Sequence, residues 1–394
     1  MISRILFVLL PLVLLPFLYV DLCWLRRRGV GRLYRLLWWI PCLLMLVWTL
    51  LLGCSRKFVP SDMGAVNAYL FLLGLVVIPL FLFSLCTAVG GVLGRLFRSR
   101  RNYGVAVGLL LVPVLWYVLL WGTFVGPRLL TVRRVTVSSP SLPRAFDGYR
   151  LVHFSDLHAG TFDKSRRGYL RRAVDTINAL EPDAVMFTGD LQNLKPDEVY
   201  PVQGILSRIH ARDGVYSVMG NHDYPIYVQA SVVDKEYYLE KLKAVEHDLG
   251  WNLLDNSHLK IRRGADSIVV AGMENDGDGR HFPQRGDVPS TLSGLGMDSY
   301  IIMLQHDPTA WRRKILPQCG AQLTLSGHTH AMQFELFGWS PASLFFREWG
   351  GVYTMPDGRA LNVSTGLGGF LPFRFGVPGE IVVITLRRGA PKAS

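Results

Sequence analysis

The sequence predicts a membrane anchor of four helices followed by an α/β domain. Half of the 394 residues are hydrophobic and only 18% are charged, which excludes a disordered polyelectrolyte, a collagen and a disulfide-rich miniprotein. The hydrophobic residues gather in the first third of the chain, in runs long enough to cross a bilayer. Beyond them, short apolar runs alternate with helical stretches and end in polar loops, as they do in α/β proteins.

The positive charge also lies in the first third. The formal net charge of the chain is +12. Residues 1–130 contain 13 Lys and Arg but only two acids, Asp21 and Asp62, a balance of +11, whereas the remaining residues hold 29 basic and 28 acidic side chains. Because the basic residues flank apolar runs instead of forming a polar face, they indicate membrane flanks, and we expect no nucleic-acid partner.

Four apolar runs have about the length of a membrane-spanning helix. Their approximate bounds are Ile5–Leu25, Leu36–Leu52, Ala68–Leu93 and Gly104–Phe124, with Asp21 as the exceptional charge. The first run has a cleaved signal peptide as its alternative. The arginines that follow Trp24 form a stop-transfer pattern, and no small-residue cleavage site is present, so we expect this run to be retained as a helix.

The distribution of arginines predicts the orientation of these helices. The second loop carries only Arg56 and Lys57, whereas the first and third loops are rich in arginine: Arg26, Arg27, Arg28, Arg32 and Arg35, then Arg95, Arg98, Arg100 and Arg101. By the positive-inside rule, the first and third loops are cytoplasmic. We therefore expect a multi-pass protein of the cytoplasmic (inner) membrane, with its C-terminal domain facing the periplasm or the cell exterior.

We expect three segments: residues 1–126 as the membrane anchor, 127–145 as a linker or an incoming strand, and 146–394 as a catalytic α/β domain. Within the last, helices are expected over Arg166–Leu180, Pro196–Ile209 and Val232–Leu249. The expected strands are Arg150–Phe154, Ala184–Phe187, Val215–Val218, Tyr300–Leu304 and Gln322–Leu325.

Each of these five strands is followed by side chains that can bind a metal. They are Asp156 and His158, then Asp190, Asn221, His306, and finally His328 and His330. Strand ends of an α/β sheet converge at one edge, where such proteins bind ligands. The donors are oxygen and nitrogen without cysteine, which suits Mn, Fe, Zn or Co. Each motif alone is common as turn chemistry, and only the ordered set makes a metal site the better interpretation.

Seven ligands exceed the needs of one four-coordinate ion but suit two divalent ions that share a bridge. Asp190 is the natural bridge, because a carboxylate has two oxygens. Two ions about 3.5–4 Å apart can hold a hydroxide between them and bind the oxygens of a phosphoryl group during displacement. The expected reaction is therefore hydrolysis of a phosphoester.

The five blocks, Asp156-Leu157-His158, Gly189-Asp190, Gly220-Asn221-His222-Asp223, His306 and Gly327-His328-Thr329-His330, resemble the calcineurin-like metallophosphoesterase superfamily. The stretch Ser364–Gly368, followed by Arg374 and a strand over Glu380–Leu386, resembles its membrane-anchored bacterial branch. The resemblance covers about Phe146–Leu386 and implies a four-layer αββα sandwich. It specifies metal chemistry well and the substrate poorly.

The resemblance also implies a role for each residue. The first metal would be held by Asp156, His158, Asp190 and His330, and the second by Asp190, Asn221, His306 and His328. His222 would face the substrate phosphate as a general acid or transition-state stabiliser. Asp223 would orient and charge-stabilise the imidazole of His222.

Two segments depart from simple expectations. Ala331-Met332 stands where relatives usually have two glycines before Gln333, so the rim of the site is expected to be bulkier. Residues 272–280 carry alternating acids, but the glutamate of an EF-hand calcium loop is absent, and we interpret them as a surface or substrate-facing loop.

An aromatic-rich stretch follows the last ligand. It contains Phe334, Leu336, Phe337, Trp339, Leu344, Phe345, Phe346 and Trp349, and later Phe370, Leu371, Phe373 and Phe375. Core packing and an apolar rim that docks on the bilayer or holds acyl chains are equally good interpretations.

The sequence thus predicts a membrane-anchored dimetal phosphohydrolase whose partners are the lipid bilayer and a phosphoester, such as a phospholipid or another lipid-linked compound. A pyrophosphate hydrolase acting on a nucleotide-sugar lipid, such as UDP-diacylglucosamine, is the alternative within the enzymes, although such a substrate is usually cytoplasmic. A non-catalytic sensor or binding module is the alternative of another class. It has no need for His222 and Asp223 beside a complete ligand set.

Overall fold

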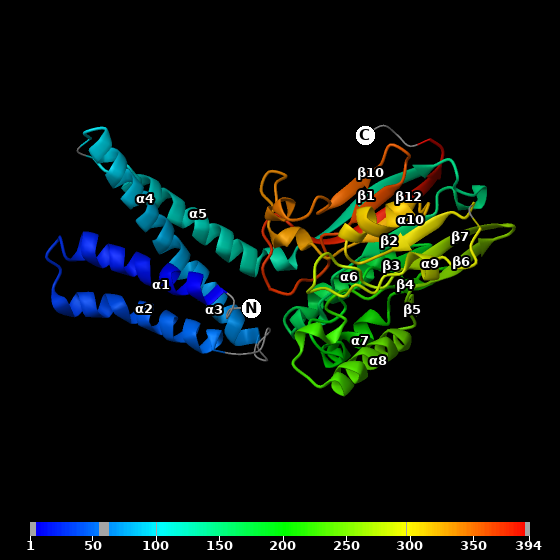
Figure 1. The fold of residues 1–394 in the computed structure, drawn as a ribbon, viewed down its shortest axis with the longest axis horizontal. Helices are drawn as coiled ribbons and strands as arrows, with labels where there is room; N and C mark the ends of the chain where they lie inside the picture. Colours follow the sequence, from blue (N-terminus) through cyan, green and yellow to red (C-terminus); the bar gives the residue numbers. More distant parts are fainter. Residues whose placement is uncertain (1–4, 55–62, 100, 297, 391–394) are drawn as a thin grey trace. The chain divides into compact units, whose positions relative to one another are not determined.

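A computed structural model describes residues 5–54, 63–99, 101–296 and 298–390. The chain divides into two compact units, Met1–Thr123 and Phe124–Ser394 (Figure 1). We call them the membrane unit and the catalytic unit and describe each by itself. Arg56, Lys57, Asp62 and Arg100, which entered the charge argument, lie outside the described residues.

The membrane unit is helical, as expected. Four of its helical segments are long and apolar enough to cross a membrane: Leu6–Leu25, Arg32–Gly53, Met63–Leu96 and Gly104–Arg128. They comprise α1 (Leu6–Val20) with the π-turn η2 (Asp21–Leu25), α2 (Arg32–Gly53), α3 (Met63–Leu72) with η3 (Leu73–Val77) and α4 (Ile78–Leu96), and α5 (Gly104–Phe124). The third span, 34 residues long, exceeds the expected Ala68–Leu93 at both ends.

The one acid inside the first span has a partner. Asp21 is buried, and the Arg35 guanidinium donates to both of its carboxylate oxygens, at 2.6 and 2.8 Å. A bidentate pair of this kind neutralises a charge that hydrocarbon would otherwise penalise. Asp21 is thus compatible with a membrane helix because α2 supplies its counter-ion.

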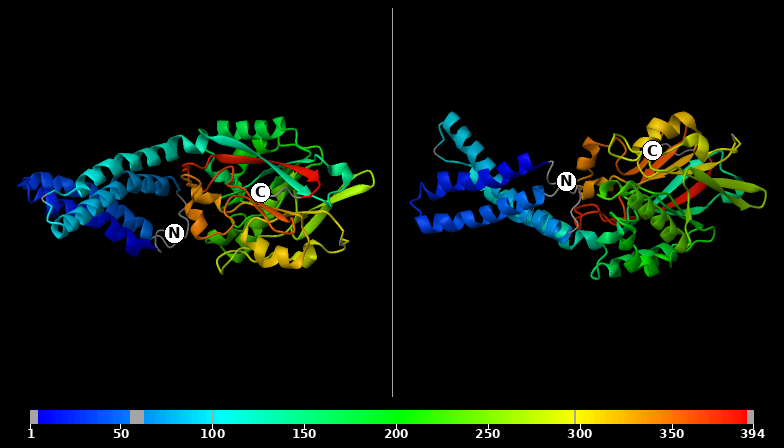
Figure 2. Two further views of the ribbon diagram at one scale, coloured as in Figure 1. Left: turned by 90° about the horizontal axis from the view of Figure 1, so that it is seen from above. Right: turned by 60° about the horizontal axis from the view of Figure 1, so that its bottom comes forward.

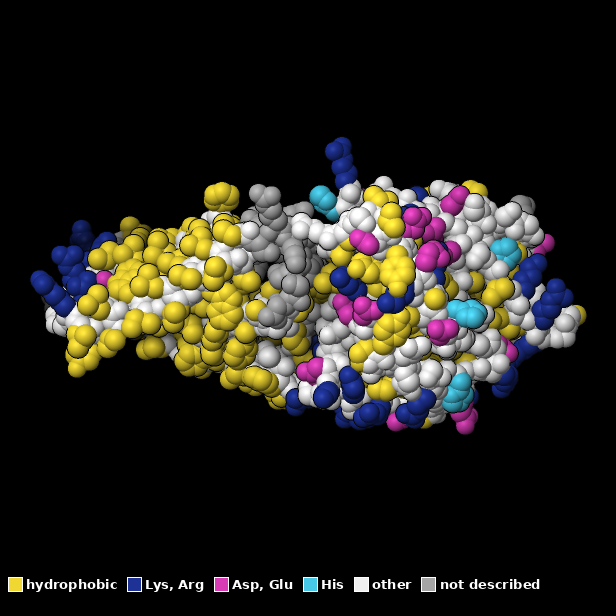
Figure 3. Space-filling model, turned by 90° about the horizontal axis from the view of Figure 1, so that it is seen from below, with side chains coloured by type: hydrophobic (Ala, Val, Ile, Leu, Met, Phe, Trp, Pro, Cys, Tyr) yellow, Lys and Arg dark blue, Asp and Glu magenta, His cyan; other side chains and the backbone are white. Residues whose placement is uncertain are grey.

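The arginines of the first and third loops lie at one end of the membrane unit. Arg27, Arg28 and Arg95 border a common cavity of about 480 Å³, and Lys and Arg side chains gather at this end of an otherwise hydrophobic surface (Figure 3). The described arginines of the two loops therefore lie at the same end of the membrane unit, as the positive-inside rule requires of loops on one side of a bilayer.

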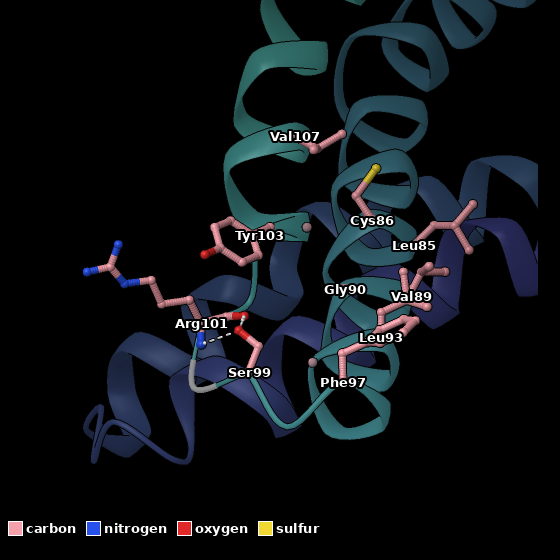
Figure 4. Close-up of a pocket in the computed structure, with 12 residues that line it drawn as sticks. Leu85, Cys86, Val89, Gly90, Leu93, Phe97, Ser99, Arg101, Tyr103 and Val107 are labelled. Carbon is pink, nitrogen blue, oxygen red and sulfur yellow. Dashed lines mark hydrogen bonds between the residues drawn. The ribbon is translucent and has the colours of Figure 1, made fainter.

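Helices α4 and α5 approach each other closely at small residues. A Cβ at Gly104 would overlap the carbonyl oxygen of Cys86, and one at Gly90 would overlap the backbone of Gly104. Small residues let membrane helices come into contact in this way. Beside the contact, an apolar cavity of about 600 Å³ is lined by both helices, including Val89, Leu93 and Val107 (Figure 4).

The catalytic unit contains two six-stranded sheets. The first has the order β1-β12-β2-β3-β4-β5, and the second has the order β10-β11-β9-β8-β7-β6. The bounds in the first sheet are β1 (Leu130–Ser139), β2 (Arg150–Phe154), β3 (Ala184–Phe187), β4 (Val215–Ser217), β5 (Asn252–Leu253) and β12 (Gly379–Arg388). Those in the second are β6 (Ser257–Arg263), β7 (Asp266–Gly272), β8 (Ile301–Leu304), β9 (Leu323–Ser326), β10 (Gly351–Thr354) and β11 (Ala360–Val363).

The two sheets pack face to face with helices outside, which confirms the expected four-layer αββα sandwich (Figure 2). Leu151 and Met186 point into the core between the sheets, whereas Val152 and Phe187 point to the helical layer. This alternation follows from the two-residue period of a strand. The outer face of the first sheet is covered by α6 (Arg167–Ala179), α7 (Tyr200–Leu206) and α8 (Val232–Asp248). That of the second packs against α9 (Val288–Thr291) and the π-turn η9 (Trp311–Ile315) with α10 (Leu316–Gln318).

Most expected elements lie within a few residues of their observed bounds, and for one segment the structure decides between two alternatives. Residues 127–145, expected as a linker or an incoming strand, contain β1, which pairs in parallel along its whole length with β12. The incoming-strand alternative therefore describes this segment. Leu130 and Val132 of β1 pack against the core on the helical side of the sheet, whereas Val135 and Val137 pack into the core between the sheets.

We predict that Gly104→Leu destabilises the membrane unit. The larger side chain meets the α4 backbone at Cys86, which cannot yield without moving a helix, and overpacking of this kind costs about 1–3 kcal/mol. Thermal unfolding of the full chain in detergent measures the loss. Ala106→Leu, an exposed substitution two residues along the same helix, serves as the control. Equal stability of both variants would show that α4 and α5 are not in contact at Gly104.

Candidate dimetal centre

The predicted metal ligands come from the ends of five strands of the catalytic unit. Asp156 and His158 follow β2, Asp190 follows β3, and Asn221 follows β4; His306 follows β8, and His328 and His330 follow β9. In each sheet, the contributing strands are parallel to one another. The ends of both sheets meet at one edge of the sandwich, so residues as far apart as Asp156 and His330 lie together.

The first group consists of Asp156, His158, Asp190 and His330. One donor atom from each lies within 4.8 Å of the other three. The Nε2 atoms of His158 and His330 are 3.1 Å apart, and the Nε2 atom of His330 is 3.2 Å from a carboxylate oxygen of Asp156. These are the four residues that the family resemblance implies for the first metal.

The second group shares Asp190 with the first. The Nε2 atom of His306 lies 3.4 Å from Asp190 Oδ2 and 3.1 Å from Asn221 Oδ1. His328 Nδ1 lies 2.8 Å from the same amide oxygen. Asp190 Oδ2 also lies 3.6 Å from His158 Nε2. Asp190 thus stands between the two groups, where a bridging carboxylate is required.

The backbone at these residues is held in an uncommon conformation. The φ angle is positive at Asp156, His158, Asp190, His328 and His330, between 50° and 74°. Non-glycine residues adopt this region at a cost of roughly 1 kcal/mol or more each. A fold that tolerates five such residues in one place aims their side chains at a common point, and strain of this kind clusters at functional sites.

The electrostatics of the centre are dominated by the buried carboxylate of Asp190. Burial alone raises its pKa, but the neighbouring His306 and His222 outweigh that effect and hold the pKa of Asp190 well below its usual range. For His306, burial opposes protonation, yet the charge of Asp190 prevails and raises the pKa of His306 to about 10. For His158, the charge of Asp190 does not offset the effect of burial, which lowers the pKa of His158 to about 3. His158 is therefore unprotonated at neutral pH, as a metal-binding imidazole must be, whereas His306 carries a proton that a bound cation would have to displace.

The residues present fit two divalent cations. Two carboxylates, one amide oxygen and four imidazoles converge, and the Nδ1 atoms of His158 and His330 are buried without a hydrogen-bond partner. The Nε2 atoms of the same two histidines lie 3.1 Å apart. Two buried imidazole nitrogens have little reason to lie so close together without a cation between them. Mixed nitrogen and oxygen donors of this kind suit Mn, Fe, Zn or Co, as the sequence indicates.

His222 stands beside the ligands rather than among them. Its imidazole ring lies 4.9 Å from that of His158, and its backbone N–H donates to Asp190 Oδ1 at 2.8 Å. The Nδ1 atom lies 2.7 Å from the Asn193 carbonyl oxygen, to which it donates its proton. This bond fixes the tautomer and leaves Nε2 for a substrate, in agreement with the role implied for His222.

Asp223 has a different position from the one expected. Instead of contacting the His222 imidazole, its carboxylate accepts four backbone N–H groups, from Asp190, Leu191, Gln192 and Gly220, at 2.7–3.2 Å. Burial, reinforced by the charge of Asp190, raises the pKa of Asp223 to about 7. Asp223 therefore ties the loop after β3 to the loop after β4, and the Asn193 carbonyl orients His222 in its place.

Two further side chains, Tyr227 and Asp307, position the ligands and were not identified from the sequence. The Tyr227 hydroxyl accepts the Asn221 amide N–H at 2.8 Å, which turns the amide oxygen toward His306 and His328. Asp307 Oδ2 lies 3.6 Å from His328 Nε2. A second partner of this kind orients a metal-bound imidazole. Of these side chains, only Asp307 could have been suspected from the sequence, because it is an acid next to the candidate ligand His306.

Arg374, singled out in the sequence through its family resemblance, is buried and lies beneath the centre. Its guanidinium donates to the carbonyl oxygens of Thr365, Gly366 and Gly368. Gly366 lies so close to Asp156 and His330 that a Cβ would be only 2.9 Å from one and 3.0 Å from the other. Arg374 thus fixes the segment on which the first metal group rests.

The two departures noted in the sequence have structural explanations. Ala331 and Met332 both have positive φ, near 50°, which is the conformation that glycine adopts without cost. In the loop after β7, Asp276 is buried and paired with Arg313 and Lys314. That acid is therefore neutralised by the protein, and the loop places Phe282 with its ring 5.3 Å from that of His328.

Phenyl rings surround the centre. Besides Phe282, Phe346 lies 5.6 Å from the His328 ring, and Phe370 lies 5.3 Å from the His222 ring and 6.2 Å from the His158 ring. Met332, Leu336, Phe337, Trp339, Leu344 and Phe345 are exposed, and the other aromatic residues of the predicted rim are half-buried. Of the two interpretations left open, the apolar rim describes this segment better than core packing does.

Known proteins resemble this chain in the same region. Residues 149–332 match the family of calcineurin-like phosphoesterases. A zebrafish (Danio rerio) protein described as a transmembrane protein with metallophosphoesterase domain is 32% identical over 263 residues, which are 64% of this chain and 56% of that relative. This chain therefore spans little more than half the length of that protein. The metallophosphoesterase YkuE of Bacillus subtilis, described as uncharacterized, is 28% identical over 68% of this chain and 89% of its own length.

A third relative has a named substrate. LpxG of Chlamydia trachomatis, described as a UDP-2,3-diacylglucosamine pyrophosphatase, is 25% identical over 70% of this chain and 94% of its own. Among solved structures, a dimetal phosphatase from Danio rerio aligns with 61% of this chain and 99% of its own at 14% identity, with a TM-score of 0.36.

A buried carboxylate behind the centre generates a prediction for pH. Glu246 of α8 is fully buried, accepts the Ser217 hydroxyl, and has one oxygen without a partner. Burial, with the charge of Asp223 second, raises the pKa of Glu246 well above its usual range. The native state then holds a proton that the unfolded chain releases above about pH 4.3, so stability falls as pH rises, by up to about 1.4 kcal/mol per unit.

We predict that Glu246→Gln, which keeps the shape and removes the ionisable group, raises the melting temperature of the full chain at pH near 8 and changes it little near pH 4. Thermal unfolding at the two pH values measures this difference. Glu236→Gln, on the exposed side of the same helix, should change neither. A variant less stable than the native chain at both pH values would mean that Glu246 is ionised and specifically paired.

Proposed function

Because this chain contains a calcineurin-like metallophosphoesterase domain, we propose that it is a membrane-anchored phosphoester hydrolase that uses two divalent cations and acts on lipid-linked substrates. The observation that supports the reaction is the convergence of seven candidate ligands, with Asp190 shared by the two groups and His222 beside them. The observation that supports the substrate class is the presence of four apolar helices in the same chain. Tethering to a bilayer raises the local concentration of lipid headgroups and favours their phosphoesters.

Two cations held by these residues would supply Lewis-acid stabilisation of the phosphoryl oxygens and lower the pKa of the attacking water. The protein's own contribution is positioning and proton transfer. Asp156, Asp190, Asn221 and the four imidazoles would hold the two cations. The Asn193 carbonyl holds Nδ1–H of His222, so the protonated ring presents Nε2–H to the leaving-group oxygen. The phenyl rings of Phe282, Phe346 and Phe370 exclude water from the surroundings of the reacting phosphorus.

We predict that His222→Ala lowers turnover of an aryl phosphate or phosphodiester by about 10²–10⁴-fold while metal remains bound, because a proton donor is lost and the ligands are kept. Asp190→Asn should lose both activity and metal, since it removes the charge that both groups share. The purified full chain is assayed with Mn, and its metal content is measured by elemental analysis.

The matched control is His247→Ala, which removes an imidazole that is almost fully exposed on α8. It should retain full activity. Undiminished turnover in His222→Ala and Asp190→Asn, with metal bound, would refute the proposed catalytic assignment. A chain that binds metal but hydrolyses no phosphoester would instead favour the non-catalytic binding module.

A pyrophosphatase acting on a nucleotide-sugar lipid is the second candidate. The similarity to LpxG over 94% of that protein favours it. The proposed topology opposes it, because nucleotide-linked lipid precursors are usually cytoplasmic and the arginine-rich loops suggest that the catalytic unit faces outward. The location of the catalytic unit therefore discriminates between the two substrates.

We predict that a reporter enzyme active only outside the cytoplasm is active when fused after residue 390. A fluorescent protein that matures only in the cytoplasm should be dark at the same position. The same reporters fused after Tyr103, in the arginine-rich third loop, provide the matched control and should give the opposite pattern. Cytoplasmic fluorescence of the C-terminal fusion would invert the topology and favour the pyrophosphatase.

A further inference from the structure

We propose that an exposed apolar surface beside the metal centre inserts into the bilayer interface and docks the catalytic unit onto the membrane. This surface, which we call the apolar lip, consists of Met332, Leu336, Phe337, Trp339, Leu344 and Phe345, all of them exposed. The inference rests on the proposed membrane location of the anchor and does not depend on the proposed reaction.

The tip of the lip exposes an aromatic residue at a conformational cost. Leu336 and Trp339 exchange two backbone hydrogen bonds, of 2.9 and 3.0 Å, around Phe337 and Gly338. Both central residues have positive φ, 52° and 78°. Asn and Gly are the usual residues in such a turn. Phe337 instead occupies this strained position, with its side chain 99% exposed. In water, neither the strain nor the exposed phenyl ring stabilises the protein.

The lip is rigidly attached to the metal centre. The buried Ser340 hydroxyl donates to the Ala331 carbonyl oxygen at 2.6 Å, one residue after the ligand His330. At the far end of the lip, Phe346 follows Phe345 and lies with its ring 5.6 Å from that of His328. Both ends of the lip therefore touch the ligand segment, and a lipid that meets the lip is also at the rim of the site.

The lip also lies beside the point where the chain leaves the membrane. The fourth span extends to Arg128, so Gly126 belongs both to the span and to the catalytic unit. A Cβ at Gly126 would overlap the carbonyl oxygen of Arg374. The next residue, Phe375, accepts the backbone N–H of Glu335 at 2.8 Å, and its ring stacks on that of Phe334.

Three short steps thus connect the membrane exit to the lip. Gly376 packs so tightly on Glu335 that a Cβ would overlap its carbonyl oxygen. The lip begins at the following residue, Leu336. In Figures 1 and 2, the orange segment that carries the lip lies at the same end of the catalytic unit as the start of β1. The bilayer is therefore the apolar phase nearest to this surface.

Basic side chains lie around the same exit. Arg172 of α6 donates to the carbonyl oxygen of Arg128 at 3.0 Å, and Arg128, Arg171 and Arg172 are all exposed, with Lys164 just before the helix. An apolar lip and exposed basic side chains that both lie near the end of the fourth span match a bilayer interface with anionic headgroups. We therefore name the occupant as an anionic phospholipid surface rather than a second copy of the chain, which would have to bury these like charges together.

The test places a spin label at the tip of the lip. Phe337→Cys is made in a chain whose five native cysteines are replaced by alanine, and the full chain is reconstituted into vesicles of zwitterionic and anionic phospholipid. Leu344→Cys is a second site on the lip. Leu259→Cys on β6, an exposed apolar position away from the lip, is the matched control. We expect both lip labels to be several-fold more accessible to oxygen than to a water-soluble nickel complex, and the Leu259 label to show the reverse.

A second measurement needs no cysteine removal. Brominated phospholipids should quench more tryptophan fluorescence in the native chain than in Trp339→Phe. Labels at both lip positions that remain as water-accessible as the Leu259 label would overturn the inference. Dipolar coupling between lip labels of neighbouring chains would overturn it in favour of a second copy. Neither measurement involves turnover, so their failure leaves the proposed hydrolase intact, and loss of activity in His222→Ala says nothing about docking.

Discussion

The charge of one buried carboxylate organises this structure. Asp190 is almost inaccessible to water and faces the imidazoles of His158 and His306. An isolated ionised carboxylate in such a place would lower the stability of the fold, and positive charge around the carboxylate offsets this loss. Three features hold the ligands around that point. They are the left-handed backbone of the ligands, the four hydrogen bonds that backbone N–H groups donate to Asp223, and the buried guanidinium of Arg374. The surrounding fold can be understood as a scaffold that keeps the charges from separating.

The sequence predicted strand bounds and ligands best where the local apolar pattern and the burial of the strand in the fold require the same residues. β2 and β3 have the bounds that their apolar runs predict, because a strand buried on both faces is mostly apolar and ends where the chain turns polar. The ligands occupy those turns, so identifying the strand end also identified the candidate ligand. The four-layer sandwich, which the motif resemblance implied, is confirmed by the packing of both sheets.

The relationships that sequence reasoning missed depend on segments far apart in the chain. β1 consists of residues that also suit a linker, and only its pairing with β12, about 250 residues later, makes it a strand. Tyr227 and Asn193 act through contacts that no spacing rule encodes. Asp223 illustrates the same limit: adjacency to His222 suggested a bond to the imidazole, whereas the turn after β4 directs the carboxylate to backbone amides. Side-chain direction within a turn is set by the tertiary structure.

The pairing of β1 with β12 bears on how the domain can be handled and how it matures. A soluble fragment that starts at residue 146 would lack β1 and leave β12, with its apolar run Ile381–Ile384, as an unpaired edge prone to aggregation. Such a fragment should begin before Leu130. In the cell, the first sheet cannot close until its last strand, β12, has been synthesised. The catalytic unit therefore completes its fold only after β12 has left the ribosome, when the four N-terminal helices have long been synthesised.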